Sequence, residues 1–209
     1  LWKKIGSTCQ NEREAHLILQ LMKDCCQVTA PGVLFIAEAI VAPVEIIKYF
    51  GEDAVIAKEC EIAYNATFMA LLWDAVATKN AKLLHQGLKS LPDKLDRATW
   101  LNYIRCHDDI GLGFDDKDVF QVGYEPRPHR ISGSLASLVG LESALESQDP
   151  QAIDNAIGLI LLLHSMILSF GGIPLLYYGD EIGTINDSTF LEDESKANDT
   201  RWAHRPKID

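Results

Sequence analysis

The chain has 209 residues, with 30 acidic and 19 basic side chains, a formal net charge of −11 and a sequence pI of about 4.9. This length suffices for one domain with a substantial core. No Lys/Arg cluster occurs, which argues against a nucleic acid or an anionic membrane as partner. A neutral sugar is compatible with an acidic, carboxylate-lined site.

The five cysteines are scattered and show no C-x-x-C spacing. This predicts reduced core thiols in a reducing, cytoplasmic compartment, with no disulfide and no zinc site. No signal peptide is visible in the sequence. The longest apolar stretch, residues 157–163, is too short to span a bilayer and predicts a buried helix.

The hydrophobic periodicity predicts helices and strands that alternate along the chain. In chain order, we expect a helix at about 11–30, a strand at 33–37, a helix at 44–50, a short strand at 59–65, a helix at 67–88 and a strand at 100–104. A Gly/Asp/Pro-rich loop at 111–133 follows, and it is long enough to suggest a function. Helices at 134–145 and 150–170 (with Asp149 as N-cap), a strand at 173–178 and a polar loop at 179–209 complete the order.

Three of these strands share one layout, in which a short apolar run ends in polar side chains. These side chains are Glu38 after the strand at 33–37, His107, Asp108 and Asp109 after the strand at 100–104, and Asp180 and Glu181 after the strand at 173–178. One such strand alone could simply run into an acidic surface turn. Their recurrence favours a parallel α/β barrel with its site at the carboxyl face. Glu38 leaves the core directly, and desolvation there would favour the protonated form that a general acid needs.

Four segments together resemble the α-amylase superfamily and, within it, the amylosucrase branch. They are FIAEAIV at 35–41, HDDIG at 107–111, GGIPLLYYGDEIGTIND at 171–187 and DTRWAHRP at 199–206. The resemblance implies a (β/α)8 TIM barrel, of which residues 1–209 would form the second half, from helix four to strand eight and the loop beyond. It also implies that the first four strands and the nucleophilic aspartate lie outside this chain.

The resemblance assigns catalytic roles to residues at two strand ends. It places Glu38 as the general acid/base and Asp108 as the aspartate that stabilises the transition state. His107 would hydrogen-bond a hydroxyl of the bound glucosyl ring. A retaining glycosidase needs an acid/base and a nucleophile about 5–5.5 Å apart.

The same resemblance assigns three binding residues. Asp109 and Arg130 would contact the fructosyl ring, and Arg201 would close the pocket by pairing with an aspartate from the first half of the barrel. The loop at 111–133, which shapes the acceptor side, is shorter than in amylosucrases. No metal or other cofactor is implied.

Two further acidic pairs receive no catalytic role. Asp180 and Glu181 are adjacent, so they point to opposite sides of an extended chain, and the resemblance makes them architectural. Glu59 and Glu61 flank a strand without a partner motif and are expected at the surface.

The sequence therefore predicts part of a retaining enzyme that cleaves sucrose and transfers the glucosyl unit to a glucan or to water. A sucrose or α-glucan hydrolase is the alternative within this class. A catalytically incomplete half-barrel that serves as a binding or assembly module is the alternative outside it. Open sheet edges in such a half-barrel favour self-association.

Overall fold

A computed structural model describes residues 4–52, 58–91, 96–111, 124–127 and 130–206. Its helices are α1 (Arg13–Thr29), α2 (Pro43–Ile46), α3 (Ala66–Thr78), α4 (Lys82–Ser90), α5 (Leu135–Leu138), α6 (Leu141–Ser147) and α7 (Pro150–Ser169). Its strands are β1 (Ile36–Ala37), β2 (Ile62–Tyr64), β3 (Thr99–Tyr103), β4 (Ile110–Gly111), β5 (Tyr124–Arg127), β6 (Arg130–Ser132) and β7 (Ile173–Leu175). Short 3-10 helices η1 (Ile47–Phe50), η4 (Asp180–Ile182), η5 (Thr189–Glu192) and η6 (Thr200–His204) lie between and after them.

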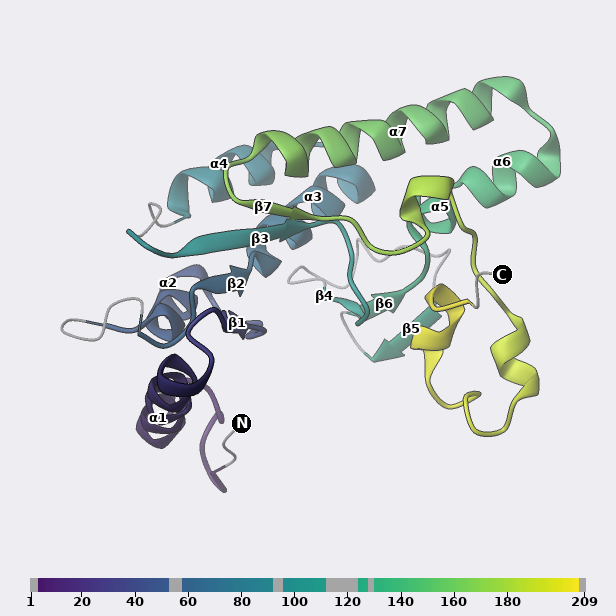
Figure 1. The fold of residues 1–209 in the computed structure, drawn as a ribbon. Helices are drawn as coiled ribbons and strands as arrows, with labels where there is room; N and C mark the ends of the chain where they lie inside the picture. Colours follow the sequence, from purple (N-terminus) through teal and green to yellow (C-terminus); the bar gives the residue numbers. More distant parts are fainter. Residues whose placement is uncertain (1–3, 53–57, 92–95, 112–123, 128–129, 207–209) are drawn as a thin grey trace.

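Four strands form a parallel sheet in the order β1-β2-β3-β7, which is also their order along the chain. The helices between them make this a series of β-helix-β units, as the sequence predicts. Figure 1 shows α3, α4 and α7 along one side of this sheet, and α1 and α2 near its β1 end. Because the strands are parallel, the segments that follow β1 and β3 leave from the same edge of the sheet.

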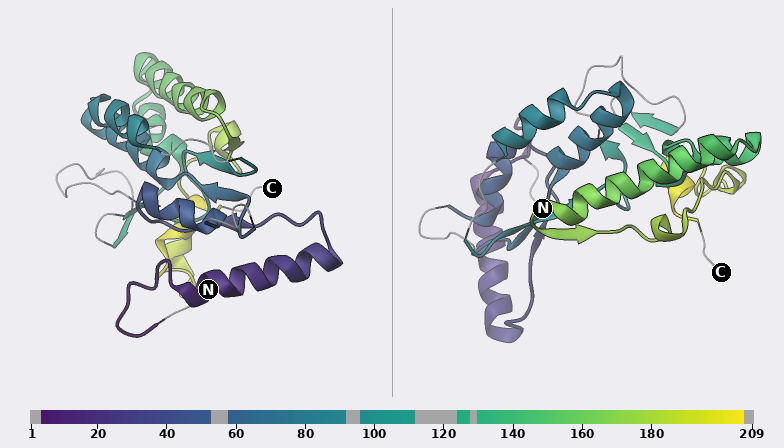
Figure 2. Two further views of the ribbon diagram at one scale, coloured as in Figure 1. Left: turned by 90° about the vertical axis from the view of Figure 1, so that its left-hand side faces the viewer. Right: turned by 90° about the horizontal axis from the view of Figure 1, so that it is seen from above.

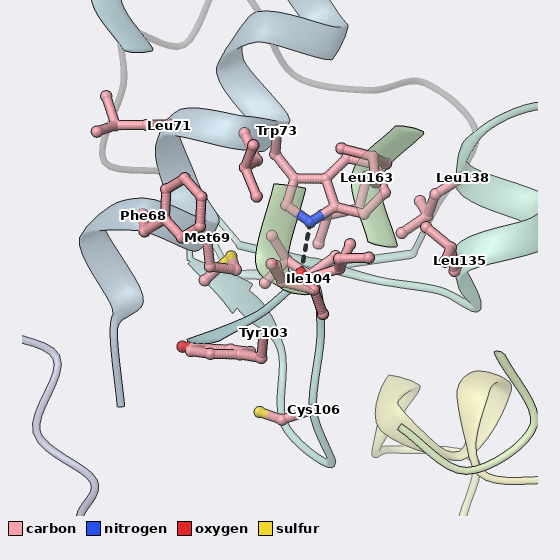
Figure 3. Close-up of a cluster of buried hydrophobic side chains, with 14 of the residues drawn as sticks. Phe68, Met69, Leu71, Trp73, Tyr103, Ile104, Cys106, Leu135, Leu138 and Leu163 are labelled. Atoms are coloured by element: carbon pink, nitrogen blue, oxygen red, sulfur yellow. Dashed lines mark hydrogen bonds between the residues drawn. The ribbon is translucent and has the colours of Figure 1, made fainter. Parts of the chain in front are cut away.

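The main core lies between the sheet and helices α3, α4 and α7 (Figures 2 and 3). Trp73 of α3 is fully buried at its centre, and its indole N–H donates to the Ile104 carbonyl over 2.8 Å. Asn65 caps α3 by accepting from the Phe68 N–H, and its amide also donates to Asn102 of β3 over 3.0 Å. The cap therefore connects the start of a helix to the strand beneath it.

Two predicted helices are each divided by a residue in the left-handed region. Lys79, with a φ of 52°, ends α3 before α4 begins, and Gly140, with a φ of 87°, separates α5 from α6. A left-handed residue ends the run of helical hydrogen bonds. The predictions of one continuous helix at 67–88 and one at 134–145 are therefore wrong, because each range contains two helices. Asp149 caps α7 as predicted, by accepting from the N–H groups of Gln151 and Ala152.

The predicted loop at 111–133 contains more structure than expected. Its described parts contribute to a second, antiparallel sheet in the order β4-β6-β5, while residues 112–123 and 128–129 lie outside the described ranges. The polar tail also contains η4, η5 and η6 instead of being entirely a loop. The predicted strand at 173–178 is shorter, since β7 ends at Leu175.

Helix α7 is far more exposed than predicted. Within the stretch 157–163, Leu163 is buried, whereas Ile157, Leu161 and Leu162 are all exposed. In length and mean hydropathy (1.7 in its most apolar window) α7 resembles a membrane span, and only 22% of that window is buried. One such helix is weak evidence for a membrane, because core helices of soluble proteins meet the same criteria. Its exposed leucines instead mark a surface that the described residues leave uncovered.

Two smaller predictions also fail. Glu59 is buried rather than at the surface, and it accepts hydrogen bonds from His16 (2.6 Å) and Gln20 (2.8 Å) of α1. Glu61 is partly buried and pairs with the buried Lys23 of the same helix. All five cysteines are free, and only two of them, Cys60 and Cys106, are buried.

Candidate active site

The predicted acid/base and the histidine meet at the carboxyl edge of the parallel sheet. Glu38 directly follows β1, and His107 lies four residues beyond the end of β3. Glu38 Oε1 and His107 Nε2 are 3.4 Å apart, although 69 positions separate them in the chain. Both side chains are about half exposed, at 48% for Glu38 and 50% for His107. Glu38 is therefore less desolvated than the sequence predicts.

Asp108, next to His107, is oriented by its own backbone neighbour and by an arginine. It accepts from the Asp109 N–H over 2.9 Å and from Arg201 Nη1 over 3.1 Å. Burial alone would raise the pKa of Asp108, but these two donors outweigh burial and hold that pKa below its ordinary value. Asp108 is thus held as a negative charge next to His107 in the chain. Its role in stabilising a cationic transition state stays a prediction.

Arg201 is anchored by a residue that the sequence prediction omitted. Asp199 Oδ1 accepts from Arg201 Nε over 2.8 Å, and Oδ2 accepts from Nη2 over 2.9 Å. The aspartate predicted to pair with Arg201 belongs to the first half of the barrel and is not among the described residues. Among these residues, Asp199 and Asp108 accept hydrogen bonds from Arg201. The Asp-x-Arg spacing at 199–201 could have revealed the pairing, because the two side chains share one short turn.

Asp109 and Arg130 lie together, and Asp109 is buried. Asp109 is buried at 6% exposure and accepts from the Ser132 hydroxyl over 2.6 Å. Arg130 Nη1 is 3.8 Å from the other Asp109 oxygen, and its side chain is 34% exposed. The pair holds β6 of the small antiparallel sheet against the end of β3. A role for either residue in contacting a fructosyl ring stays a prediction.

Asp180 is architectural, as the sequence predicts. It forms a buried ion pair with Arg105, with distances of 2.8 Å to Nε and 2.7 Å to Nη2. Arg105 Nη1 also donates to His204 Nδ1 over 2.9 Å. Arg205, the next residue, donates to the His107 carbonyl over 2.7 Å. The C-terminal segment is therefore attached to the end of β3 at three points: Arg201, His204 and Arg205.

Comparison with known proteins gives relatives among trehalose synthases and glucosylglycerate phosphorylases. No family model matches the chain. The trehalose synthase/amylase TreS of Mycobacterium tuberculosis is 28% identical over 196 residues, which cover 92% of this chain and 31% of that protein. Glucosylglycerate phosphorylase of Escherichia coli is 24% identical over 208 residues, covering 92% of this chain and 36% of that protein. The chain thus spans about a third of the length of these relatives.

Two solved structures share the fold. Sucrose 6F-phosphate phosphorylase from Thermoanaerobacter thermosaccharolyticum superposes with a TM-score of 0.63 and 17% identity, covering 98% of this chain and 40% of that one. Cyclic α-maltosyl-(1→6)-maltose hydrolase from Arthrobacter globiformis superposes with a TM-score of 0.53 and 18% identity, covering 92% of this chain and 33% of that one. The chain is similar to enzymes named for α-glucosides over about a third of their length, which supports the resemblance to the α-amylase superfamily without singling out its amylosucrase branch.

Proposed function

We propose that this chain is the second half of a (β/α)8 catalytic barrel of α-amylase type, and that the whole protein breaks α-glucosidic bonds by a retaining route. The observation that carries the proposal is the 3.4 Å approach of Glu38 to His107, beside the oriented Asp108, at the carboxyl edge of a parallel sheet. The sheet order β1-β2-β3-β7 matches consecutive strands of such a barrel.

Each residue has a defined role in this proposal. Glu38 protonates the glycosidic oxygen of the leaving group and later removes a proton from the acceptor. A carboxylate from a strand outside the chain attacks the anomeric carbon and forms the covalent glucosyl intermediate. His107 donates to a hydroxyl of the bound ring, and Asp108 stabilises positive charge that develops on that ring in the transition state.

For the substrate, we propose sucrose as the glucosyl donor, with a glucan or water as acceptor. This proposal rests on the HDDIG segment and on the proximity of Asp109 to Arg130. The relatives include phosphorylases, so inorganic phosphate is a second candidate acceptor.

The substrate is tested by supplying the full-length protein with sucrose, trehalose or glucosylglycerate, each with and without phosphate. Free fructose together with a growing glucan supports transfer, and free glucose with fructose supports hydrolysis. Glucose 1-phosphate would assign the protein to the phosphorylases. Absence of turnover with all three donors would favour the binding-module alternative.

The role of Glu38 is tested by Glu38→Gln in the same full-length protein. We expect turnover to fall by about 10²–10⁴-fold, because the amide cannot protonate the leaving group. The variant should also lose the high-pH decline of turnover, which reports deprotonation of the acid. Glu181→Gln is the matched control, since Glu181 is an exposed glutamate of η4 whose oxygen accepts from the Gly179 N–H, as an amide oxygen also can. Equal turnover in both variants would remove Glu38 from this role.

A further inference from the structure

Three side chains with different metal-binding atoms meet where β1 and β3 end. The carboxylate of Glu38, the thiol of Cys106 and the imidazole of His107 place one donor atom each within 4.8 Å of the others. The sequence predicts no metal here, because the cysteines are scattered and show no C-x-x-C spacing. From this geometry we propose that Glu38, Cys106 and His107 bind a divalent cation of the zinc class.

One of the three distances between ligand atoms already suits a tetrahedral ion, and all three lie within 4.8 Å. Zinc binds carboxylate oxygen and imidazole nitrogen at about 2.0–2.2 Å and thiolate sulfur at about 2.3 Å, so neighbouring ligand atoms lie about 3.3–3.8 Å apart. The Glu38 oxygen and His107 Nε2 already satisfy this at 3.4 Å. Small rotations of the half-exposed Glu38 and His107 side chains would bring their ligand atoms to a similar distance from the Cys106 sulfur. Three protein ligands leave one position open for water, as in catalytic zinc sites.

The donor set selects the class of cation. Magnesium and calcium prefer six or more oxygen ligands, and the cluster offers a single carboxylate. A sulfur, a nitrogen and an oxygen together favour zinc, cobalt or copper. When the ion binds, Cys106 forms the metal–sulfur bond as a thiolate and its proton leaves to solvent.

The backbone that presents two of the ligands is fixed on both sides. Before Cys106, the Ile104 carbonyl accepts from the buried indole of Trp73 over 2.8 Å. After it, the His107 carbonyl accepts from Arg205 over 2.7 Å. Figure 3 shows the Cys106 sulfur and the Tyr103 hydroxyl, at the edge of the buried cluster, directed to the same side. A fixed frame of this kind lowers the ordering cost of binding.

A zinc ion bound at these three side chains would also affect catalysis, an inference that rests on the proposed function. An ion that holds the Glu38 carboxylate prevents it from donating or accepting a proton, so zinc would inhibit the enzyme. The binding itself does not depend on that function.

The test uses Co²⁺ as a spectroscopic probe in the full-length protein. We expect a thiolate-to-cobalt charge-transfer band, which Zn²⁺ removes by displacement and which Mg²⁺ and Ca²⁺ leave unchanged. Cys106→Ser should abolish the band and weaken Zn²⁺ binding by about tenfold or more, since even a supporting residue of a metal site is worth that much. Cys60→Ser is the matched control, because Cys60 is an equally buried thiol beside two glutamates.

A second variant keeps the proposal testable if Cys106→Ser does not fold. His107→Asn changes a half-exposed side chain and should weaken Zn²⁺ binding by a similar factor. The proposal is overturned by a missing band in the unmodified protein, by a band that persists in Cys106→Ser, or by one that disappears in Cys60→Ser. Because the readout is spectroscopic, inactivity toward every glucosyl donor would contradict the proposed function and leave the metal site intact.

Discussion

Arg105 is a fully buried arginine whose guanidinium contacts three partners at the end of β3. It pairs with Asp180, donates to His204 and lies 4.4 Å from the centre of the Tyr177 ring. Breaking a buried ion pair by removing one partner costs about 3–5 kcal/mol, because the remaining charge is left uncompensated. The cluster explains why Asp180, the first residue of η4, is a structural residue although the sequence pattern resembles a catalytic one.

His204 gives this cluster a dependence on pH. Arg105 can only donate, so His204 Nδ1 accepts and the proton of the neutral ring lies on Nε2, which has no hydrogen-bond partner among the described residues. Burial, followed by the positive charge of Arg105, lowers the pKa of His204 to about 3. In the unfolded chain the pKa is about 6.5. Between these values the unfolded chain binds a proton that the folded protein does not, so the free energy of unfolding decreases as the pH falls.

The prediction is that His204→Gln weakens this pH dependence. At pH 5 the protonation term of His204 should cost the unmodified protein about 2 kcal/mol relative to pH 7, and the variant should lack that term. Denaturant unfolding at both pH values measures it, and the exposed His85 provides the control His85→Gln. Equal losses of stability in His204→Gln and the unmodified protein would contradict the assigned protonation state.

At the scale of elements, the sequence predicts the order of strands and helices but not where the helices break. Periodicity reports which face is apolar, and that face continues across Lys79 and Gly140 although the chain turns there. The burial of Glu59 was missed for another reason. Its partner His16 is 43 positions away, on a helix whose side of the sheet cannot be read from local sequence. The small sheet β4-β6-β5 was missed because its Gly- and Asp-rich connection is typical of a loop.

The site follows the same division. The approach of Glu38 to His107 could be predicted, because strand ends in a parallel sheet share one edge. The pairing of Arg201 with the distant Asp108, the burial of Asp109 and the position of Cys106 beside Glu38 could not. These depend on how the C-terminal segment and the second sheet fold back onto β3.

Gly171 and Gly172 at the start of β7 form a matched pair. A Cβ on Gly172 would lie 2.6 Å from the Trp100 carbonyl oxygen, at a φ of 137° that side chains rarely adopt, whereas a Cβ on Gly171 would meet nothing within 4 Å. We expect Gly172→Ala to lower the free energy of unfolding by about 2 kcal/mol or more, and Gly171→Ala to change it by less than about 0.5 kcal/mol. Denaturant unfolding measures both. A similar, small effect of the two substitutions would show that β7 does not approach β3 as closely as described.

For the whole molecule, the parallel sheet has two outer strands, β1 and β7, each paired on one side only among the described residues. Apolar side chains remain exposed at both, including Ile36 of β1 and Ile173 of β7. The helix α7, which also carries exposed leucines, runs beside β7 (Figure 1). Open edges with apolar side chains favour pairing with another chain. In the proposed barrel the missing strands would cover both edges.

The covered edge predicts that Ile173→Lys benefits the 209-residue chain, by reducing its self-association, and destabilises the full-length protein. In the 209-residue chain alone, the charge should reduce self-association, because a lysine on an edge strand opposes edge-to-edge pairing. In the full-length protein, where the proposed barrel covers β7, the same lysine should lower the free energy of unfolding by about 1–3 kcal/mol.

Ile185→Lys is the control, since Ile185 is similarly exposed (42% against 43%) and lies outside both sheets. Sedimentation measures the first effect and denaturant unfolding the second. A monomeric chain before substitution, or a full-length protein that tolerates Ile173→Lys as well as Ile185→Lys, would show that β7 is a natural edge and not a strand inside a closed barrel.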